Sequence, residues 1–260
     1  MAIKFLLVLL FTYVTAGYSQ QRSASSKVTG GTMATEGQVP WMISIQRKID
    51  NGQFCGGSII GQNWIVTAAQ CSQIDMNAYQ VRAGSLTYDT GGSVHDIVKI
   101  IVHENYNYNT LENDIAVWLI LQSFNDNLRK PIALPTQNTP SGEGLSVIVA
   151  GWGATKYGGE PSKDLMTSTM SIISTRDCDE NYSNFGGIPD NQICAGDSIM
   201  GQVDSCQFDT GGPLYTTVGI PNPELRGIVS WGYGCGLAEF PGVYTEVSKY
   251  RDWIKEQTGL

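Results

Sequence analysis

The sequence predicts an all-β protein, and three observations support that fold class. Charged residues make up only 15% of the chain, glycine occurs 30 times in 260 residues, and the apolar residues fall in short runs that contain Val, Ile, Thr and Tyr. Residues of these types favour strands, and glycine favours the tight turns between strands. The composition excludes a disordered chain, a collagen and a coiled coil.

The strand-forming runs fall into two groups along the chain. The first group lies at 41–46, 57–60, 64–68, 79–83, 97–102 and 114–119. The second group lies at 145–151, 165–173, 212–215, 226–230 and 242–246. Between the groups, residues 123–144 are polar and contain Pro131, Pro135 and Pro140, which is typical of a connector. We therefore expect two β-units joined by a linker.

A helical pattern occurs at the end of the chain, over about 247–258. Val247, Tyr250, Trp253 and Ile254 share one face at helical spacing. We expect this helix to pack against the second β-unit.

The first residues predict a secretory signal peptide over 1–19. Lys4 precedes the apolar run 5–14, and the small residues 15–17 follow it. The run is shorter than the ~20 residues of a membrane-spanning helix, so the mature protein is expected to be secreted and soluble. Residues 20–27 are small and polar, and we interpret them as a removable segment that ends at Lys27.

The charge balance restricts the partners. Three basic residues and no acidic residue precede Val28, so the net charge of −8 becomes −11 from Val28 onward. Such a chain is repelled by phosphates, which argues against nucleic acid and membrane surfaces as partners and leaves extracellular proteins. We expect the protein to act as a monomer.

Six cysteines, an even number in a secreted chain, predict three disulfides. Their count allows 15 pairings and does not choose among them. No close CxxC pair suggests a metal site, and the sequence predicts neither metal nor cofactor.

Eight segments together resemble the chymotrypsin-like, trypsin-type serine protease family across 28–260. They are VTGG at 28–31, CGGS at 55–58, WIVTAAQC at 64–71, NDIA at 113–116, GWG at 151–153, DSCQFDTGGP at 204–213, SWG at 230–232 and PGVY at 241–244. The resemblance implies two six-stranded antiparallel β-barrels of the chymotrypsin type, at about 28–135 and about 136–246, with an active cleft between them. It also implies the disulfides Cys55–Cys71, Cys178–Cys194 and Cys206–Cys235.

The sequence departs from this family at the residues that carry its chemistry. The family's catalytic histidine falls on Gln70, whose amide cannot take up a proton near neutral pH. The family's nucleophilic serine falls on Thr210, an internal residue without the N-terminal amine that activates threonine in other enzymes. The family's orienting aspartate is kept as Asp114, which we interpret as a buried structural carboxylate able to accept a hydrogen bond from Gln70. His95 and His103 lie away from these motifs.

Phe208 replaces the glycine that the family has two residues before its nucleophile. Glycine there lets a substrate approach the backbone amides that stabilise the oxyanion. We expect the Phe208 ring to cover or distort this hole, or to lie across the leaving-group side of the cleft. The alternative is a ring turned outward that leaves the hole usable.

Other family features are retained. Asp209 matches the aspartate that pairs with a new terminal amine, here that of Val28 after cleavage behind Lys27. Asp204, Gly232 and Gly242 match a specificity pocket for Arg or Lys, which we expect to be vestigial and filled by the protein's own side chains. Asn181 begins an Asn-Tyr-Ser sequon and is a glycosylation candidate.

The combined pattern predicts a secreted pseudoprotease that is not an enzyme and acts by binding proteins. It looks like the inactivated serine protease paralogues of the scabies mite, which are relatives of the mite group 3 allergens. That resemblance implies a gut or faecal location and interference with host defence proteins such as complement. The alternative is a weak trypsin-like endopeptidase that cleaves after Arg or Lys.

Overall fold

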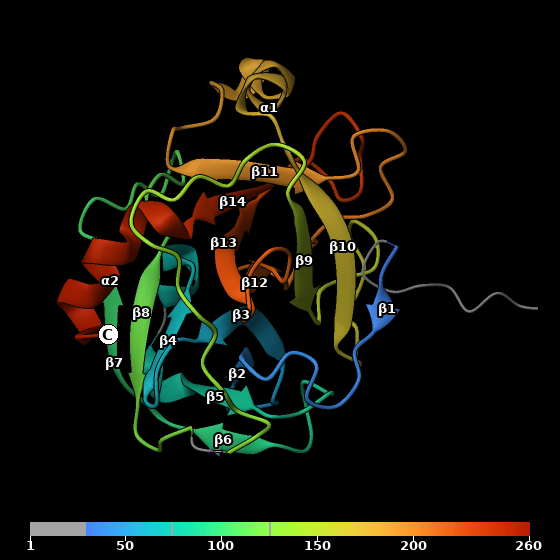
Figure 1. Cartoon of the computed structure of the whole chain (residues 1–260). Coiled ribbons are helices and arrows are strands. Elements are labelled where there is room, and N and C mark those ends of the chain that lie inside the picture. The colour runs from blue at the N-terminus through green and yellow to red at the C-terminus, as the bar shows by residue number, and fades with distance from the viewer. Residues whose placement is uncertain (1–29, 74, 125) are drawn as a thin grey trace, which may run out of the picture.

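The computed structural model describes residues 30–260 except Ile74 and Asn125, and it confirms the all-β class (Figure 1). The predicted signal peptide, the segment 20–27 and Val28 lie outside the described residues. In the part of the chain that is described, fourteen strands form two sheets, each assembled from antiparallel neighbours.

The first sheet has the order β6-β5-β2-β3-β4-β8-β7. Its strands are β2 (Met42–Arg47), β3 (Gln53–Ile59), β4 (Trp64–Thr67), β5 (Tyr79–Ala83), β6 (Ser93–His95), β7 (Ile97–Val102) and β8 (Ala116–Ile120). The edge strands β6 and β7 are consecutive in the chain and are separated only by Asp96. One bent segment therefore pairs with β5 through its first part and with β8 through its second part, which curls the sheet around its core.

The second sheet closes into a six-stranded barrel. Its strands are β9 (Ser146–Gly151), β10 (Met166–Ile173), β11 (Gln192–Gly196), β12 (Pro213–Thr216), β13 (Glu224–Trp231) and β14 (Gly242–Glu246). Closure results because β10 pairs with both β9 and β11. The short strand β1 (Thr32–Met33) also pairs with β10, although the sequence assigned the chain from about residue 28 to the first barrel.

Two short α-helices lie outside the sheets. The first, α1 (Thr175–Asn181), connects β10 to β11. The predicted C-terminal helix consists of a 3-10 turn, Val247–Tyr250, followed by α2 (Arg251–Thr258). The expectation that this helix packs on the second unit is confirmed only for the 3-10 turn, which contacts β13. The following α2 lies beside β8 of the first sheet (Figure 1), and Ile254 is buried in a core to which both units contribute.

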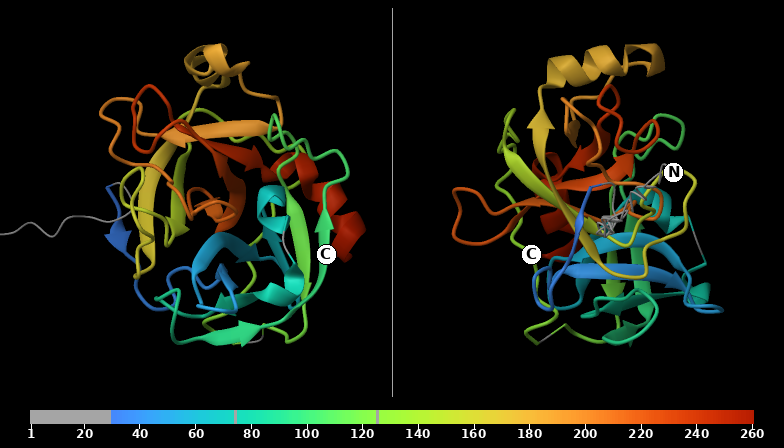
Figure 2. Two further views of the ribbon diagram at one scale, coloured as in Figure 1. Left: turned by 180° about the vertical axis from the view of Figure 1, so that it is seen from behind. Right: turned by 90° about the vertical axis from the view of Figure 1, so that its right-hand side faces the viewer.

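The two β-units are stacked and touch through glycine-rich segments (Figure 2). The backbone N–H of Gly56 in β3 donates to the carbonyl oxygen of Thr210, 2.8 Å away. A Cβ atom on Gly56 would lie 2.9 Å from Cα of Gly212, so any larger residue would push the two units apart.

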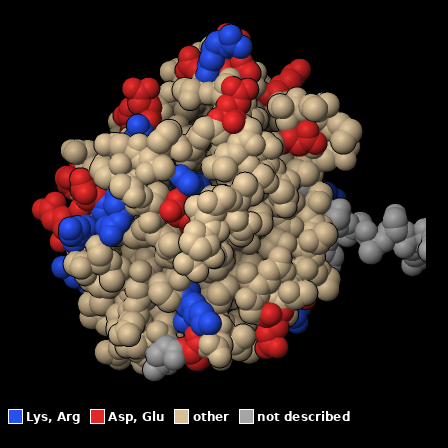
Figure 3. All heavy atoms as spheres, in the orientation of Figure 1, with Lys and Arg blue, Asp and Glu red and all other residues tan. Residues whose placement is uncertain are grey.

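Charge is unevenly distributed on the surface. Figure 3 shows acidic side chains over α1 and the loops next to it, with few basic groups among them. Within the described residues, no helix is long and apolar enough to span a membrane.

Candidate active site

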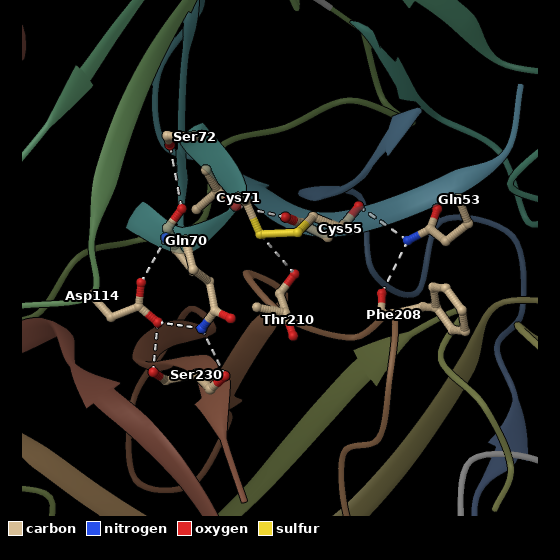
Figure 4. The surroundings of a disulfide bond; sticks show 12 residues. Gln53, Cys55, Gln70, Cys71, Ser72, Asp114, Phe208, Thr210 and Ser230 are labelled. Atoms are coloured by element: carbon tan, nitrogen blue, oxygen red, sulfur yellow. Dashed lines mark hydrogen bonds between the residues drawn. A yellow bond between two sulfur atoms is a disulfide. The ribbon is translucent and has the colours of Figure 1, made fainter. Parts of the chain in front are cut away.

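The two sheets bring Gln70, Asp114 and Thr210 together (Figure 4). Gln70 lies in the 3-10 turn Ala69–Ser72 after β4. Asp114 lies two residues before the first residue of β8, Ala116. Because β4 and β8 are antiparallel neighbours, with Thr67 opposite Ala116, the end of β4 and the start of β8 are adjacent. Thr210 reaches the same place from the turn before β12.

The side-chain amide of Gln70 is held by two acceptors. Its Nε2 donates to Oδ2 of Asp114 (2.7 Å) and to the carbonyl oxygen of Ser230 (2.9 Å). The opposite orientation would turn the amide oxygen toward these two acceptors, so the network fixes the amide with its nitrogen inward. The amide oxygen of Gln70 consequently lies on the side of Thr210 (Figure 4).

Asp114 is fully buried, as expected, and its carboxylate is surrounded by donors. Oδ1 accepts from the backbone N–H of Gln70 (2.9 Å), and Oδ2 also accepts from the Ser230 hydroxyl (2.6 Å). Burial raises the pKa of Asp114, while the hydrogen bonds from Ser230 and Gln70 oppose that rise. The carboxylate thus orients Gln70, which confirms that Gln70 donates a hydrogen bond to it.

Among the described residues, the side chain that faces Thr210 is the amide of Gln70, which is not a base near neutral pH. A side-chain amide oxygen can accept a hydrogen bond from a hydroxyl, but it does not take up the proton near neutral pH. Among the described residues, the Thr210 hydroxyl makes no hydrogen bond. His95 and His103 serve other contacts: His95 is buried beside Ser93, and His103 packs against Tyr250 and Trp253.

Phe208 occupies a strained backbone position. Its φ is 74°, and the N–H of Asp209 donates to the carbonyl oxygen of Cys206 (3.0 Å), which closes a turn around Gln207 and Phe208. A positive φ in such a turn favours glycine and costs a bulky residue about 1 to 2 kcal/mol. The expected distortion therefore takes the form of backbone strain.

The ring of Phe208 does not cover the catalytic positions. It points away from Thr210 and Gln70, beyond the Cys55–Cys71 disulfide on the side of Gln53 (Figure 4). The ring therefore does not lie over Thr210 and Gln70, while the expectation that it lies across the leaving-group side of the cleft stays a prediction. In the described part of the chain, the backbone N–H groups of Phe208 and Thr210 donate no hydrogen bond.

Gln53 is a residue of this site that the sequence did not indicate. It is buried in β3, and its Nε2 donates to the carbonyl oxygens of Cys55 (3.0 Å) and Phe208 (3.2 Å). The Ser44 hydroxyl donates to its Oε1. A polar residue at the start of a strand carries no signal for such a role, since its partner is 155 residues away in the sequence.

Asp209 is buried beneath the same turn. Its carboxylate accepts from the backbone N–H groups of Gly153 (2.7 Å) and Cys206 (3.0 Å), and burial raises its pKa to about 7. A Cβ atom on Gly153 would lie 2.1 Å from Oδ2 of Asp209, which explains the glycine of the GWG segment. Val28, the partner expected from the sequence, is outside the described residues.

Asp204, Gly232 and Gly242 line one cavity of about 190 Å³, with Thr210 at its border. The side chains of Tyr157 and Gln207 also line this cavity, whereas Phe208 and Tyr233 do not. The expectation of a vestigial pocket stays a prediction. Asp204 lies in its wall and is buried; Oδ2 accepts from the N–H of Gly236 (2.9 Å), while Oδ1 makes no hydrogen bond to described residues. Burial raises the pKa of Asp204 to about 7.

Three disulfides hold the loops around this site. They join Cys55 to Cys71, Cys178 to Cys194 and Cys206 to Cys235, as the family resemblance implied. Cys55–Cys71 fixes the turn that carries Gln70, and Cys206–Cys235 joins two walls of the pocket. Asn181, the glycosylation candidate, lies apart from the pocket at the end of α1.

Comparison with known proteins identifies the family. The Trypsin family matches residues 28–254. The chain is 42% identical over 240 residues to Trypsin-1 of Astacus astacus, covering 88% of this chain and 98% of that protein. It is 38% identical over 238 residues to Trypsin Blo t 3 of Blomia tropicalis, covering 89% and 86%. It is 36% identical over 239 residues to Trypsin 5G1 of Aedes aegypti, covering 91% and 87%. The chain therefore belongs to the trypsin family of chymotrypsin-like serine proteases.

Proposed function

We propose that this chain is a secreted pseudoprotease, a trypsin-family protein that binds other proteins without cleaving them. The observation that carries this proposal is the fixed amide of Gln70. Its nitrogen is committed to Asp114 and Ser230, and its oxygen cannot accept the proton of Thr210. Peptide cleavage by this family needs a base that takes this proton and later returns it to the leaving amine.

The size of the loss supports the same function. Removing the base of a serine protease triad lowers kcat by about 10⁶, and what remains derives from the oxyanion donors and substrate binding. The backbone N–H groups of Phe208 and Thr210 can supply only this remainder. The replacement of serine by Thr210 adds a methyl group to the nucleophile and restricts its χ1.

As partners we propose extracellular proteins of a host, complement components among them. The resemblance to inactivated mite protease paralogues supports this choice, and so does the similarity to Trypsin Blo t 3 of Blomia tropicalis. The net charge of −11 from Val28 onward favours proteins over nucleic acids and anionic membranes. The proposed location is extracellular, in the gut lumen or faeces, and the proposed state is a monomer without cofactor or metal.

A weak trypsin-like endopeptidase is the second candidate. The cavity beside Thr210, with the buried carboxylate of Asp204 in its wall, favours it. The relatives named above are all trypsins, which is the reason to test for cleavage after Arg or Lys directly.

The test uses the chain cleaved after Lys27. It is incubated with arginyl chromogenic substrates and with a fluorophosphonate probe, whose phosphorus is attacked by an activated hydroxyl with loss of fluoride. We expect neither turnover nor labelling. Turnover or stoichiometric labelling that disappears in the matched Thr210→Ala variant would overturn the pseudoprotease and establish the endopeptidase.

A further inference from the structure

Two neighbouring loops of the second barrel expose large apolar side chains, which we call the apolar rim: Ile199, Met200 and Leu237. Their exposed fractions are 87%, 70% and 45%. The loops are adjacent because the N–H of Gln202 donates to the carbonyl oxygen of Gly236 (2.9 Å). Contiguous exposed apolar side chains mark interaction sites more often than isolated ones do.

The conformation of the first loop is fixed by hydrogen bonds. Oδ1 of Asp197 accepts from the N–H groups of Ile199 (3.0 Å) and Met200 (3.2 Å), and the N–H of Gly201 donates to the carbonyl oxygen of Asp197 (3.0 Å). The turn thus holds both side chains toward solvent before any partner arrives. Preorganisation of this kind reduces the entropy that binding costs.

An acidic groove lies next to the two loops that carry the apolar rim. It is a cavity of about 570 Å³ lined by Glu143, Asp177 and Glu239, and by the rim's sequence neighbours Ser198 and Ala238. Among the described residues no Lys or Arg lines it, and it shares no lining residue with the pocket of Asp204. Arg176 pairs with Asp177 (3.0 Å) at its border, with the Arg176 side chain 80% exposed.

Charge around the groove selects the kind of partner. From Ser174 to Glu246 the chain has ten acidic and two basic residues. Figure 3 shows acidic groups around α1, which borders the groove, with a basic group at its tip. A second copy of this chain would bring the same negative charge to the contact, whereas a basic surface would be attracted to it.

We propose that the apolar rim and the acidic groove together form a docking surface for a cationic protein segment, one with Lys or Arg side chains next to apolar ones. This inference rests on the proposed binding function and gives it a location. The groove shares no lining residue with the pocket of Asp204, while Leu237 of the apolar rim lines a neighbouring hollow that shares Gly232 and Cys235 with that pocket. The apolar side chains of the partner would cover Ile199 and Met200, and its basic side chains would enter between Glu143 and Glu239.

The test measures binding to a defined probe, a fluorescein-labelled synthetic peptide of alternating Lys and Leu, by fluorescence anisotropy. The matched peptide of alternating Glu and Leu is the charge control. The chain starts at Val28 and is produced in bacterial cells, which leave Asn181 at the groove unmodified. Two double variants are compared with the parent: Ile199→Ser/Met200→Ser for the apolar rim and Glu143→Gln/Glu239→Gln for the groove.

Each variant has a matched control elsewhere on the surface. Val218→Ser removes an apolar side chain that is 55% exposed in the turn between β12 and β13, and Glu256→Gln removes an exposed carboxylate of α2. We expect the rim variant to weaken Lys–Leu binding about tenfold or more, because a few central residues carry most binding energy. The groove variant is expected to bind the Lys–Leu peptide about tenfold more weakly at low salt. Its affinity should change much less with salt concentration than that of the parent. The controls are expected to bind like the parent.

Three results would overturn the inference. They are equal binding by the parent and both double variants, equal binding of the Glu–Leu peptide, and a parent dimer in sedimentation that the rim variant abolishes, which would make a second copy the occupant. A fourth result would also overturn it: a chain from residue 20 that no longer binds would assign the surface to Arg22 and Lys27 of its own segment. Turnover of arginyl substrates would instead overturn the proposed function and leave the binding comparison as measured.

Discussion

The side-chain amide of Gln53 in the first sheet donates to the carbonyl oxygen of Phe208 in the second unit, at 3.2 Å. Phe208 is the residue whose φ of 74° places it in the left-handed region. The hydrogen bond therefore ties a strained turn of one β-unit to a buried strand of the other.

Removing this amide should destabilise the protein. In Gln53→Ala the hydroxyl of Ser44 and the carbonyl oxygens of Cys55 and Phe208 lose a partner. We expect the free energy of unfolding to fall by about 1 to 3 kcal/mol, measured by urea denaturation. The exposed Gln62→Ala variant should stay within about 0.5 kcal/mol of the parent. A loss no greater than in that control would contradict a structural role for Gln53.

Backbone strain at Phe208 predicts that the glycine variant is more stable than the alanine variant, which is the reverse of the usual order. Phe208→Gly and Phe208→Ala both remove the ring, so their difference reports the backbone alone. At a position with φ of 74°, glycine should be more stable than alanine by about 1 kcal/mol. Thermal unfolding of the two variants measures this difference. A more stable alanine variant would show that the turn is not left-handed.

Restoring the base and the nucleophile should create activity without a change at Phe208. The sequence alone favoured a ring over the oxyanion hole, but the ring points away from Thr210 (Figure 4). We expect Gln70→His/Thr210→Ser, cleaved after Lys27, to hydrolyse arginyl substrates at least about 10²-fold faster than Thr210→Ser alone. If further change of Phe208 to glycine were required for any turnover, the observed ring position would not be the one that matters in solution.

The stability of the uncleaved chain should fall as the pH rises. Burial raises the pKa of Asp209 from 3.8 to about 7, so between these values the native state binds more protons than the unfolded state. Protonated Asp209 therefore contributes fully to the free energy of unfolding below pH ~4. This contribution, up to about 4 kcal/mol, is lost as the pH rises toward 7. Urea denaturation at several pH values measures how steeply the free energy of unfolding falls with pH. Asp209→Asn should make this slope smaller but not zero, because Asp204 still titrates in the variant.

Cleavage after Lys27 supplies the comparison for this slope. If the new amine of Val28 pairs with Asp209, it lowers the pKa of that carboxyl, and the contribution of Asp209 to the slope disappears. An unchanged slope after cleavage would mean that the two groups do not pair.

Asn181 should carry an N-linked glycan when the chain is made in eukaryotic secretory cells. Its side chain is half-buried at the end of α1 and borders the acidic groove, and Ser183 is exposed. We expect a mass shift that an N-glycosidase removes and that both Asn181→Gln and Ser183→Ala abolish. Identical masses for parent and variants would exclude the modification.

The strand β11 and the helix α1 are absent from the sequence-based prediction, for different reasons. Residues 192–196 form β11 in the barrel, yet Gln-Ile-Cys-Ala-Gly lacks the alternation of a strand, because its pairing with β10 and β14 decides its conformation. The helix α1 was also missed, although Ser174 caps it by accepting from the N–H of Asp177 (3.0 Å) and Ser-x-x-Asp is a recognisable start. The packing of α2 on the first sheet depends on the fold of the whole chain.

The amino-acid sequence alone determined the all-β class, the strand-rich halves and, through motifs of a known family, which residues match the family's catalytic positions. These are properties of residue type and order, so the chain states them directly. The direction of the Gln70 amide, the outward ring of Phe208, the pocket at Asp204 and the bond from Gln53 were decided only by the tertiary structure. Each depends on atoms from segments far apart in the sequence, whose mutual positions exist only once the two β-units have packed.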